Sequence, residues 1–532
     1  SVSFRWRMGL DVAASNWGWW VDNIKVYTCI PVPGAFNKTT PSNGGTNVAL
    51  STTLSWNSSP YATSYQYCYD VIDDNKCNRT WGTVTNTSAP ISSLGANTTY
   101  FWQVRASNQV ATTEADNQSW GSFTTTSTLP AGTADLETSI RGTLQGKYSL
   151  GSGLSLRETY TGVNNGPVMM RSANGIPMIA AERMIYKANG VDTSFSEMMG
   201  MPASQLDTTY WLPWYNNKDL NTQLRIANVS DTDAVIHVSI GGAPVSGSPY
   251  SLTPGASKRL SFPGIDKGPV KIESNVNIVA AERVIYKVNG LNTSYSEMMA
   301  LPNKQLDTTY WLPWYNSKNL NTQLRIANVS DTDATVNVSI GGTPVDGSPF
   351  LIPVGASKRL SFPGIDKGPV KIESDVNIVA AERVIYRVNG VDTSFSEMMA
   401  VPAGQLDTFY WLPWYNNKSA SIDTQLRFAN VSDQPATVYV TIGGIEVADS
   451  PFTLTPGAST RRSFAGIDKG PVKIESDVPI VVAERVIYKA PGNIPTSFSE
   501  MTGLPDHLLD TAYWLPWYNN VELNTQLRFG VP

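Results

Sequence analysis

Hydrophobic and polar residues alternate along short segments of the chain, and Gly, Pro, Asp and Asn residues separate these segments. Leu324 and Ile326, for example, alternate with polar neighbours in residues 322–329, and a turn follows at residues 330–333. Further segments of this kind lie at residues 336–340, 349–353, 357–362, 370–373 and 378–388. A period of two residues with turn residues between the segments is typical of β-strands. The pattern therefore predicts sandwich units of about seven strands each.

One such unit recurs four times in the second part of the chain. The peptide Tyr-Trp-Leu-Pro-Trp-Tyr-Asn begins at Tyr210, Tyr310, Tyr410 and Tyr513, at spacings of 100, 100 and 103 residues. The tripeptide Ala-Glu-Arg begins at Ala181, Ala281, Ala381 and Ala483. These units resemble the Ig-like repeats of bacterial surface proteins. The resemblance implies an all-β fold of tandem β-sandwich units, arranged as beads on a string.

Two segments precede the repeats. Residues 31–126 resemble a fibronectin type III domain, because Leu54-Ser-Trp56 and Trp102-Gln-Val-Arg105 fall where that family places strands B and F. Residues 1–30 resemble the closing strands of the jelly-roll domains that follow secreted bacterial peptidases. This resemblance rests on the passage from Asn16 to Cys29 and implies a partial jelly-roll strand pair. We expect the chain to be a piece of a longer precursor.

The boundaries between repeats can be drawn in two ways. In the first, each unit begins after Asn-Val-Ser-Asp, so that the chain holds four self-contained units. In the second, which we favour, Asn-Val-Ser-Asp-Thr-Asp is a hairpin turn inside a unit, because short polar turns normally join strands that pair. The second phase gives a linker at 127–133, repeats at 134–209, 210–309, 310–409 and 410–512, and a final strand pair at 513–532.

The second phase leaves the first repeat without its strands A and B, while the chain ends in a surplus A–B pair. Exposed strand edges and large buried aromatics favour pairing with another chain. We therefore predict a head-to-tail extracellular filament, in which each molecule completes its neighbour by donor-strand complementation. A first repeat completed by strands of its own polypeptide would remove the basis of this prediction.

The residues expected at this filament interface come from the two ends of the repeat array. The donor residues are Tyr513, Trp514, Leu515, Trp517, Tyr518, Leu527 and Phe529. The acceptor residues are Ile140, Leu144, Leu154, Leu156, Val168, Ile179, Met184 and Tyr186. The partner of the chain would then be a second copy of itself.

A second function is compatible with the same sequence. The chain would be a monomeric stalk or a carbohydrate-binding accessory region of a secreted peptidase or adhesin. The aromatic peptides support this alternative, because exposed Trp and Tyr rings beside Asn can bind glycans; packing inside and between units is the competing interpretation, which we favour.

Composition places the protein outside the cell or at its surface. Charged residues make up only 16% of the chain, and the net charge of −5 is spread without a basic stripe, which argues against nucleic acid as a partner. No apolar run approaches the roughly 20 residues that cross a bilayer. Cys68 and Cys77 flank a polar turn and are candidates for a disulfide, with free thiols as the alternative.

The sequence contains no arrangement typical of an enzyme, a metal site or a bound cofactor, so we expect none of these. His237 and His507 lie in unlike contexts. Asp231 and Asp233 suggest calcium, but a later copy lacks the second carboxylate, which favours ordinary turn chemistry. Two glutamates recur in every repeat, and we expect them to be structural. One candidate role is a cross-strand ion pair with the arginine of Gln-Leu-Arg, such as Arg225.

Overall fold

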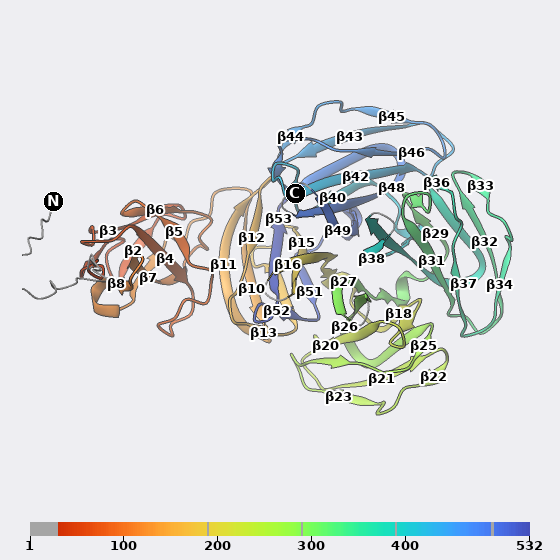
Figure 1. Cartoon of the computed structure of the whole chain (residues 1–532), viewed down its shortest axis with the longest axis horizontal. Helices are drawn as coiled ribbons and strands as arrows, with labels where there is room; N and C mark the ends of the chain where they lie inside the picture. The colour runs from red at the N-terminus through yellow and green to blue at the C-terminus, as the bar shows by residue number, and fades with distance from the viewer. Residues whose placement is uncertain (1–29, 189–190, 289–290, 389–390, 491–493) are drawn as a thin grey trace, which may run out of the picture.

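The computed structural model describes residues 30–188, 191–288, 291–388, 391–490 and 494–532. The predicted jelly-roll strand pair at residues 1–30 lies almost entirely outside these described residues. The rest of the fold is nearly all β, as predicted, and consists of a series of β-sandwich units. The four repeats do not hang as separate beads on a string. They pack side by side around a common centre and close into a ring, with the N-terminal sandwich attached to the outside of the first repeat (Figure 1).

The N-terminal sandwich has two sheets around one apolar core. One sheet contains β1 (Lys38–Thr40), β3 (Thr52–Trp56) and β6 (Ser88–Ile91). The other contains β2 (Gly45–Val48), β9 (Gly121–Thr125), β7 (Thr99–Ser107), β4 (Ser64–Asp70) and β5 (Gly82–Val84), with β8 (Thr112–Glu114) paired to β7. The single turn η1 (Ala115–Gln118) precedes β9. Trp56 and Tyr100 are buried in the core, and a disulfide joins Cys68 to Cys77.

Repeat 2 illustrates the plan of the ring units. Its first sheet contains β22 (Ala243–Pro244), β21 (Ala234–Ile240), β26 (Val270–Val288), β18 (Asp207–Leu212) and β28 (Leu301–Pro302), with β23 (Tyr250–Leu252) on β21. Its second sheet contains β24 (Ser257–Leu260), β20 (Asn221–Asn228), the other half of β26, and β27 (Leu291–Met299). β19 (Tyr215–Asn216) pairs with β25 (Asp266–Lys267), and η2 (Ala203–Gln205) leads into the repeat.

Repeats 3 and 4 follow the same plan. Repeat 3 contains β29 (Asp307–Leu312), β30 (Tyr315–Asn316), β31 (Asn321–Asn328), β32 (Ala334–Ile340), β33 (Thr343–Pro344), β34 (Phe350–Ile352), β35 (Ser357–Leu360), β36 (Asp366–Lys367), β37 (Val370–Val388), β38 (Val391–Met399) and β39 (Val401–Pro402). Repeat 4 contains β40 (Asp407–Leu412), β41 (Tyr415–Asn416), β42 (Ile422–Asn430), β43 (Ala436–Ile442), β44 (Ile445–Glu446), β45 (Phe452–Leu454), β46 (Ser459–Arg462), β47 (Asp468–Lys469), β48 (Val472–Ala490), β49 (Ile494–Thr502) and β50 (Leu504–Pro505). The single turns η3 (Asn303–Gln305), η4 (Ala403–Gln405) and η5 (Asp506–Leu508) join successive units.

Two details of the predicted strands are wrong. Residues 370–373 and 378–388 form one continuous strand, β37, whose first half belongs to one sheet and whose second half belongs to the other. The Asn-Val-Ser-Asp turn does not close a hairpin, because β31 and β32 pair with opposite halves of β37 and not with each other. The Asn328 side chain instead holds the turn by donating to the carbonyl oxygens of Thr332 and Ile352.

Repeat 1 is completed by the end of its own polypeptide. Its body contains β10 (Thr133–Ile140), β11 (Thr143–Gly151), β12 (Ser155–Glu158), β13 (Asn164–Asn165), β14 (Val168–Ser172), β15 (Ile179–Ala188), β16 (Val191–Met199) and β17 (Met201–Pro202). The missing strands are β51 (Ala512–Leu515), β52 (Tyr518–Asn519) and β53 (Asn524–Gly530), which we call the closing strands. β51 lies between β14 and β17, and β53 lies between β12 and β15. The prediction that a second molecule supplies these strands is therefore wrong for this structure.

The centre of the ring is built from four hairpins, one per repeat, and the two strands of the repeat 1 hairpin are β15 and β16. Each hairpin binds the next through a backbone N–H of one repeat that donates to a serine hydroxyl of the preceding one. The four bonds are Glu297 to Ser196, Glu397 to Ser296, Glu500 to Ser396 and Glu197 to Ser499, at 2.8–2.9 Å. The last bond joins repeat 1 to repeat 4, so the chain of contacts is cyclic.

The same hairpins place the alanine of each Ala-Glu-Arg against the core of the preceding repeat. Ala281 belongs to the core cluster of repeat 1, Ala381 to that of repeat 2, and Ala181 to that of repeat 4. A larger side chain at this position would push neighbouring units apart, because protein interiors are packed without spare volume.

The N-terminal sandwich is fixed to repeat 1 by a mostly buried ion pair. Arg79 of the sandwich and Glu158 at the end of β12 lie 2.5 Å apart, and both side chains are largely shielded from solvent. The Arg79 guanidinium also lies over the rings of Tyr69 and Tyr148, and the Tyr100 hydroxyl donates to the carbonyl oxygen of Lys147. The sandwich and the ring are therefore joined by specific contacts and not only by a linker.

We expect Glu158→Gln to destabilise the protein strongly, because it leaves Arg79 as a buried charge without a counter-ion. Breaking a buried pair in this way costs about 3–5 kcal/mol. Urea denaturation followed by fluorescence would measure the loss. Glu373→Gln is the matched control, because its pair with Lys371 is half-exposed and such pairs contribute at most about 1 kcal/mol. Equal losses in the two variants would contradict the role assigned to Arg79 and Glu158.

Candidate functional site

The Trp-rich peptide sends its side chains in two directions. In repeat 2, Tyr210 and Tyr215 are fully buried in their own core, and their hydroxyls donate to the carbonyl oxygens of Ile278 and Thr222. The tryptophans face the next repeat. Trp211 packs in the core cluster of repeat 3, and the Trp214 ring lies 4.7 Å from the guanidinium of Arg325. In the part of the chain described, the peptide thus serves core and inter-repeat packing, the interpretation favoured from the sequence.

The predicted donor residues divide in the same way. Tyr513, Leu515, Tyr518, Leu527 and Phe529 are fully buried in the core of repeat 1. Trp514 and Trp517 instead face repeat 2, where Trp514 packs against the core cluster and Trp517 lies 4.8 Å from the guanidinium of Arg225.

The predicted acceptor residues meet the closing strands only in part. Ile140, Val168 and Ile179 share the core with them, and Leu156 pairs with Phe529 across the strands. Leu144 is half-buried and Leu154 is 54% exposed, so neither belongs in the core. Met184 is buried opposite Thr525 and accepts a hydrogen bond from Arg283 of repeat 2, while Tyr186 packs edge-on against Tyr295 of repeat 2 at 5.3 Å.

The recurring glutamates and arginines form a buried belt around the ring centre. Each repeat has a first glutamate in Ala-Glu-Arg and a second glutamate in Ser-Glu-Met. The second glutamate forms an ion pair with the arginine of Ala-Glu-Arg, which lies on the facing strand of the same hairpin. These pairs are Arg183–Glu197, Arg283–Glu297, Arg383–Glu397 and Arg485–Glu500, with Nε to Oε1 distances of 2.6–2.7 Å. The arginine of Gln-Leu-Arg, which sequence analysis had paired with these acids, instead lies over a tryptophan of the preceding repeat.

The first glutamate of each repeat is buried beside this belt. Burial and the nearby negative charge of Glu297 raise the pKa of Glu182 well above its usual value. Glu282, Glu382 and Glu484 occupy equivalent positions, and their pKa values are raised for the same reasons. A protonated carboxyl is therefore the form that the folded ring favours at these four positions.

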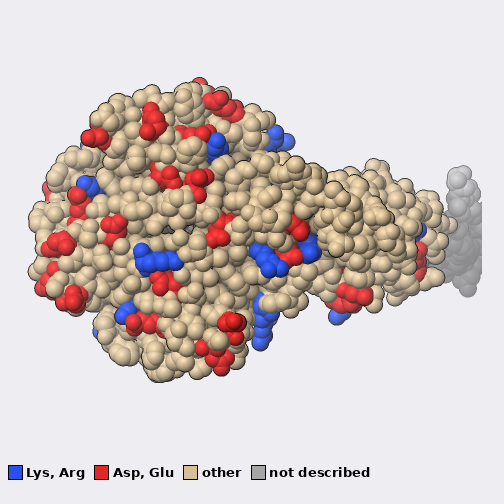
Figure 2. All heavy atoms as spheres, turned by 180° about the vertical axis from the view of Figure 1, so that it is seen from behind, with Lys and Arg blue, Asp and Glu red and all other residues tan. Residues whose placement is uncertain are grey.

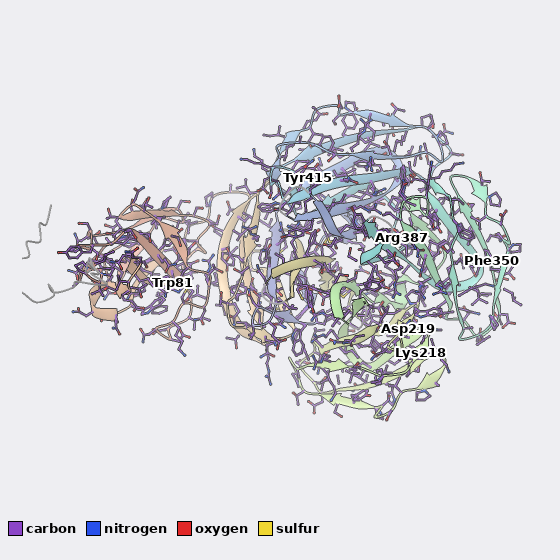
Figure 3. The ribbon with its side chains drawn as sticks, in the orientation of Figure 1. Trp81, Lys218, Asp219, Phe350, Arg387 and Tyr415 are labelled. Carbon is purple, nitrogen blue, oxygen red and sulfur yellow. A yellow bond between two sulfur atoms is a disulfide. The ribbon has the colours of Figure 1, made fainter. Side chains whose placement is uncertain are left out.

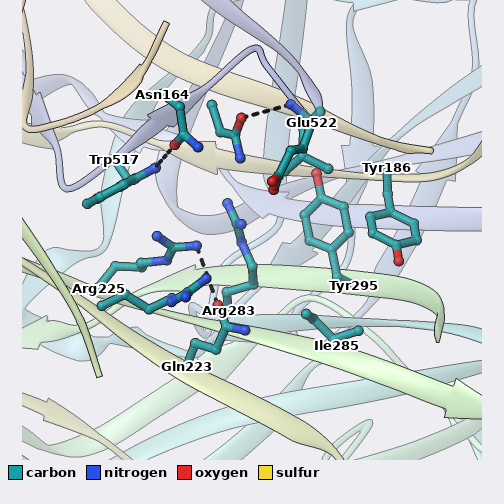
Figure 4. A pocket seen from close by; sticks show the side chains of 12 residues that line it. Asn164, Tyr186, Gln223, Arg225, Arg283, Ile285, Tyr295, Trp517 and Glu522 are labelled. Carbon is teal, nitrogen blue, oxygen red and sulfur yellow. Dashed lines mark hydrogen bonds between the residues drawn. The ribbon is translucent and has the colours of Figure 1, made fainter. Parts of the chain in front are cut away.

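A cavity of about 580 Å³ lies between repeats 1 and 2, and we call it the repeat 1–2 pocket (Figure 4). Repeat 1 and the closing strands contribute Asn164, Tyr186, Trp517, Asn519, Glu522 and Leu523. Repeat 2 contributes Gln223, Arg225, Arg259, Arg283, Ile285 and Tyr295. The volume is within the range of about 300–1,000 Å³ that is usual for small-molecule sites.

Two buried polar groups of this pocket have no hydrogen-bond partner among the described residues, namely Arg225 Nε and the Tyr295 hydroxyl. Burial, together with repulsion from Arg283, lowers the pKa of Arg225 to about 9, which leaves the guanidinium charged at neutral pH. Burial raises the pKa of Tyr295, so its hydroxyl keeps its proton. The pocket therefore offers a cation and a hydrogen-bond donor between aromatic rings.

The remaining surface carries little concentrated charge. Figure 2 shows acidic and basic side chains scattered over one face of the ring, with most of that face uncharged. The exposed residues Lys218 and Asp219 lie side by side on repeat 2, the half-buried Phe350 lies on the outer side of repeat 3, and Arg387 lies nearer the ring centre (Figure 3). Among the described residues, His, Cys, Asp and Glu side chains form no cluster suited to a metal ion. None of the helices in these residues is long and apolar enough to span a membrane.

Sequence analysis missed most of the repeat 1–2 pocket. It singled out Tyr186, Arg225 and Trp517, each with a different role, and it did not identify Asn164, Arg259 or Tyr295. A comparison of the four repeats could have identified two of these residues, because they differ from the residues at the equivalent positions. Asn164 stands where the other repeats have Asp266, Asp366 and Asp468, and Tyr295 stands where they have Phe195, Phe395 and Phe498.

No protein-family model and no curated protein sequence matches the chain. Solved structures resemble it only distantly. An α-L-rhamnosidase from Dictyoglumus thermophilum is 9% identical, with a TM-score of 0.16 over 95% of this chain and 48% of the other, so this chain spans about half of that protein. SGBP-B of the Bacteroides ovatus mixed-linkage glucan utilization locus, solved in complex with a mixed-linkage heptasaccharide, is 9% identical with a TM-score of 0.13, over 65% of this chain and 97% of the other. The BSP domain of a biofilm-associated protein is 10% identical with a TM-score of 0.13, over 91% and 99%.

Proposed function

We propose that the chain is a self-closed, non-enzymatic binding module of an extracellular or cell-surface protein, and that its ligand is a glycan. The observation that carries this proposal is the completion of repeat 1 by the closing strands of the same chain. Closure in cis fills the gap between β14 and β17 and the gap between β12 and β15, and it builds one wall of the repeat 1–2 pocket. The fold thereby forms a closed ring with a preformed cavity.

Three further features support the proposal. The Cys68–Cys77 disulfide fits an oxidising compartment. Seven polar or charged side chains and three aromatic rings line the pocket, which gives it many hydrogen-bonding groups beside some apolar surface, as a sugar requires. The interfaces between repeats are continuous around the ring, so the wall residues are held in place from both sides.

The oligomeric state and the ligand test this proposal together. We expect light scattering to give a single species near 57.9 kDa over a wide concentration range. We also expect a glycan array to show saturable binding, which Trp517→Ala reduces at least tenfold because it removes a wall of the pocket. Trp314→Ala, at the interface between repeats 3 and 4, is the matched control. A monomer that binds no glycan would contradict the proposal.

The filament predicted from the sequence is the second candidate function. In the closed ring it would require the closing strands to leave their own molecule and enter another. The observation that favours it is that β51 and β53 complete a repeat far away in the sequence, so that the same strand pairs could form within one chain or between two. Concentration-dependent polymers that share the contacts of β51 and β53 would support the filament and would overturn the monomeric module.

A further inference from the structure

Two residues of the repeat 1–2 pocket, Asn164 and Tyr295, differ from their counterparts in all three other interfaces, and both changes favour a negatively charged ligand. A third lining residue, Glu522, stands where repeats 2 and 3 have Asp219 and Asn319. We propose that this pocket binds an acidic sugar, in which a carboxylate is attached to a pyranose ring. This inference rests on the proposed glycan-binding function and specifies the class of glycan. Neither change alters the packing of the ring, because Asn is isosteric with Asp and Tyr differs from Phe by one hydroxyl.

The first change removes a carboxylate next to the arginines. In each interface the second tryptophan of the Trp-rich peptide donates its indole N–H to a side chain on the facing short strand. The acceptors are Asp266, Asp366 and Asp468 in three interfaces and Asn164 in the repeat 1–2 pocket, each at 2.7 Å. An amide satisfies the indole as well as a carboxylate does, but it leaves the adjacent arginine charge without that neighbouring anion.

The arginines of the pocket provide the site for a carboxylate. Arg225 is almost completely buried, its guanidinium lies over the Trp517 ring, and its Nη2 makes only a long contact of 3.4 Å with Gln223. Arg259 is exposed at the rim and faces the same space. Arg283 is already paired with Glu297. Because planar guanidinium groups bind carboxylates through paired hydrogen bonds, Arg225 and Arg259 are the groups available to the ligand.

The second change adds a hydrogen-bond donor on the wall of the pocket. The Tyr295 hydroxyl is buried and has no partner within the described part of the chain, although buried hydroxyls normally have one. The half-buried Trp517 ring lines the same pocket and provides apolar surface for a sugar ring. The carboxylate of Glu522 lines the same pocket and can accept hydrogen bonds from sugar hydroxyls. This acceptor disfavours a small inorganic anion and favours a ligand whose sugar units carry hydroxyls beside the carboxylate.

Isothermal titration with trigalacturonate and with the neutral trisaccharide maltotriose tests the inference. We expect the intact chain to bind trigalacturonate and to bind maltotriose at least tenfold more weakly, with an affinity for trigalacturonate that falls as salt is added. Asn164→Asp should weaken binding of trigalacturonate at least tenfold, and Tyr295→Phe should weaken it several-fold. Both variants restore residues that the other repeats already contain, so folding should be retained.

Asp266→Asn is the matched control, because it makes the same exchange at the interface between repeats 2 and 3 and should leave trigalacturonate binding unchanged. If neutral glycans bind as tightly as acidic ones, or if Asn164→Asp has no effect, the acidic-sugar inference is wrong while the glycan-binding function stands. If no glycan binds to the intact chain, the inference and the proposed function both fail.

Discussion

Deletion of residues 511–532 should unfold repeat 1 and open the ring. The deletion removes five fully buried side chains of the repeat 1 core, namely Tyr513, Leu515, Tyr518, Leu527 and Phe529. Each is worth about 1.5–3 kcal/mol of burial, so the loss is on the order of 10 kcal/mol, which equals the whole stability of a typical domain. We expect a lower melting temperature, binding of a hydrophobic dye and a tendency to aggregate.

A peptide that spans residues 511–532 should restore the truncated chain when it is added in trans. Because the peptide must pair with β14 and β12, restoration would be seen as recovery of the melting temperature with a measurable dissociation constant. A peptide with Leu527→Asp and Phe529→Asp should not restore it. A truncated chain that melts like the intact chain would show that the closing strands are not part of the folded repeat.

The sequence allowed the fold class to be predicted, because alternation around Leu324 and Ile326 identifies a strand. The hairpin that supported the chosen repeat phase does not form, although residues 513–532 do supply strands to repeat 1. The sequence did not reveal that the donor and the acceptor belong to one molecule. Whether the donor and acceptor strands meet within one molecule depends on the rotation between successive repeats. This rotation is set by the packing of the central hairpins.

The physical reason for closure in cis is effective concentration. Once four repeats bring the end of the chain beside repeat 1, pairing is intramolecular, and linked partners reach effective concentrations in the millimolar range. A second molecule at micromolar concentration cannot compete with this. The Ala-Glu-Arg and Ser-Glu-Met peptides are the part of the sequence that indicates packing between repeats. They place a small residue, a charged pair and a serine together on strands that would face water in a separate sandwich.

The buried belt of charges makes the stability of the ring depend on pH in an unusual direction. The pKa values of Glu182, Glu282, Glu382 and Glu484 are raised in the folded state by burial and by a neighbouring glutamate. In the unfolded chain these carboxyls ionise near their usual pKa of about 4.3. The folded state therefore holds more protons above that pH, and its stability falls as the pH rises through the raised pKa values.

The carboxyls whose pKa values are lowered on folding affect the stability in a different pH range. Pairing with Lys147 and Arg171 outweighs burial and lowers the pKa of Glu137, and hydrogen bonds from His507 do the same for Asp407. These carboxyls lose their stabilising effect only in acid, below their ordinary pKa of about 4. Above that range the carboxyls whose pKa values burial raises should determine the trend. The four buried glutamates lead this group, because their pKa values lie well above the usual one, and Asp70, Asp135 and Glu158 act in the same direction.

We expect the melting temperature to be higher at pH 5.5 than at pH 8, and the quadruple Glu→Gln variant at these four positions to lose that difference. Glutamine keeps the shape of a protonated glutamate and has no proton to release, so the variant should also melt at a higher temperature than the intact chain at pH 8. Glu273, Glu373 and Glu475 are the matched control set, because they lie in exposed surface pairs of the same repeats, and their exchange for Gln should leave the pH trend intact. A melting temperature that rises from pH 5.5 to pH 8 in the intact chain would mean that the four buried carboxyls are ionised in the folded ring, each held by a cation such as Arg225 or Arg283.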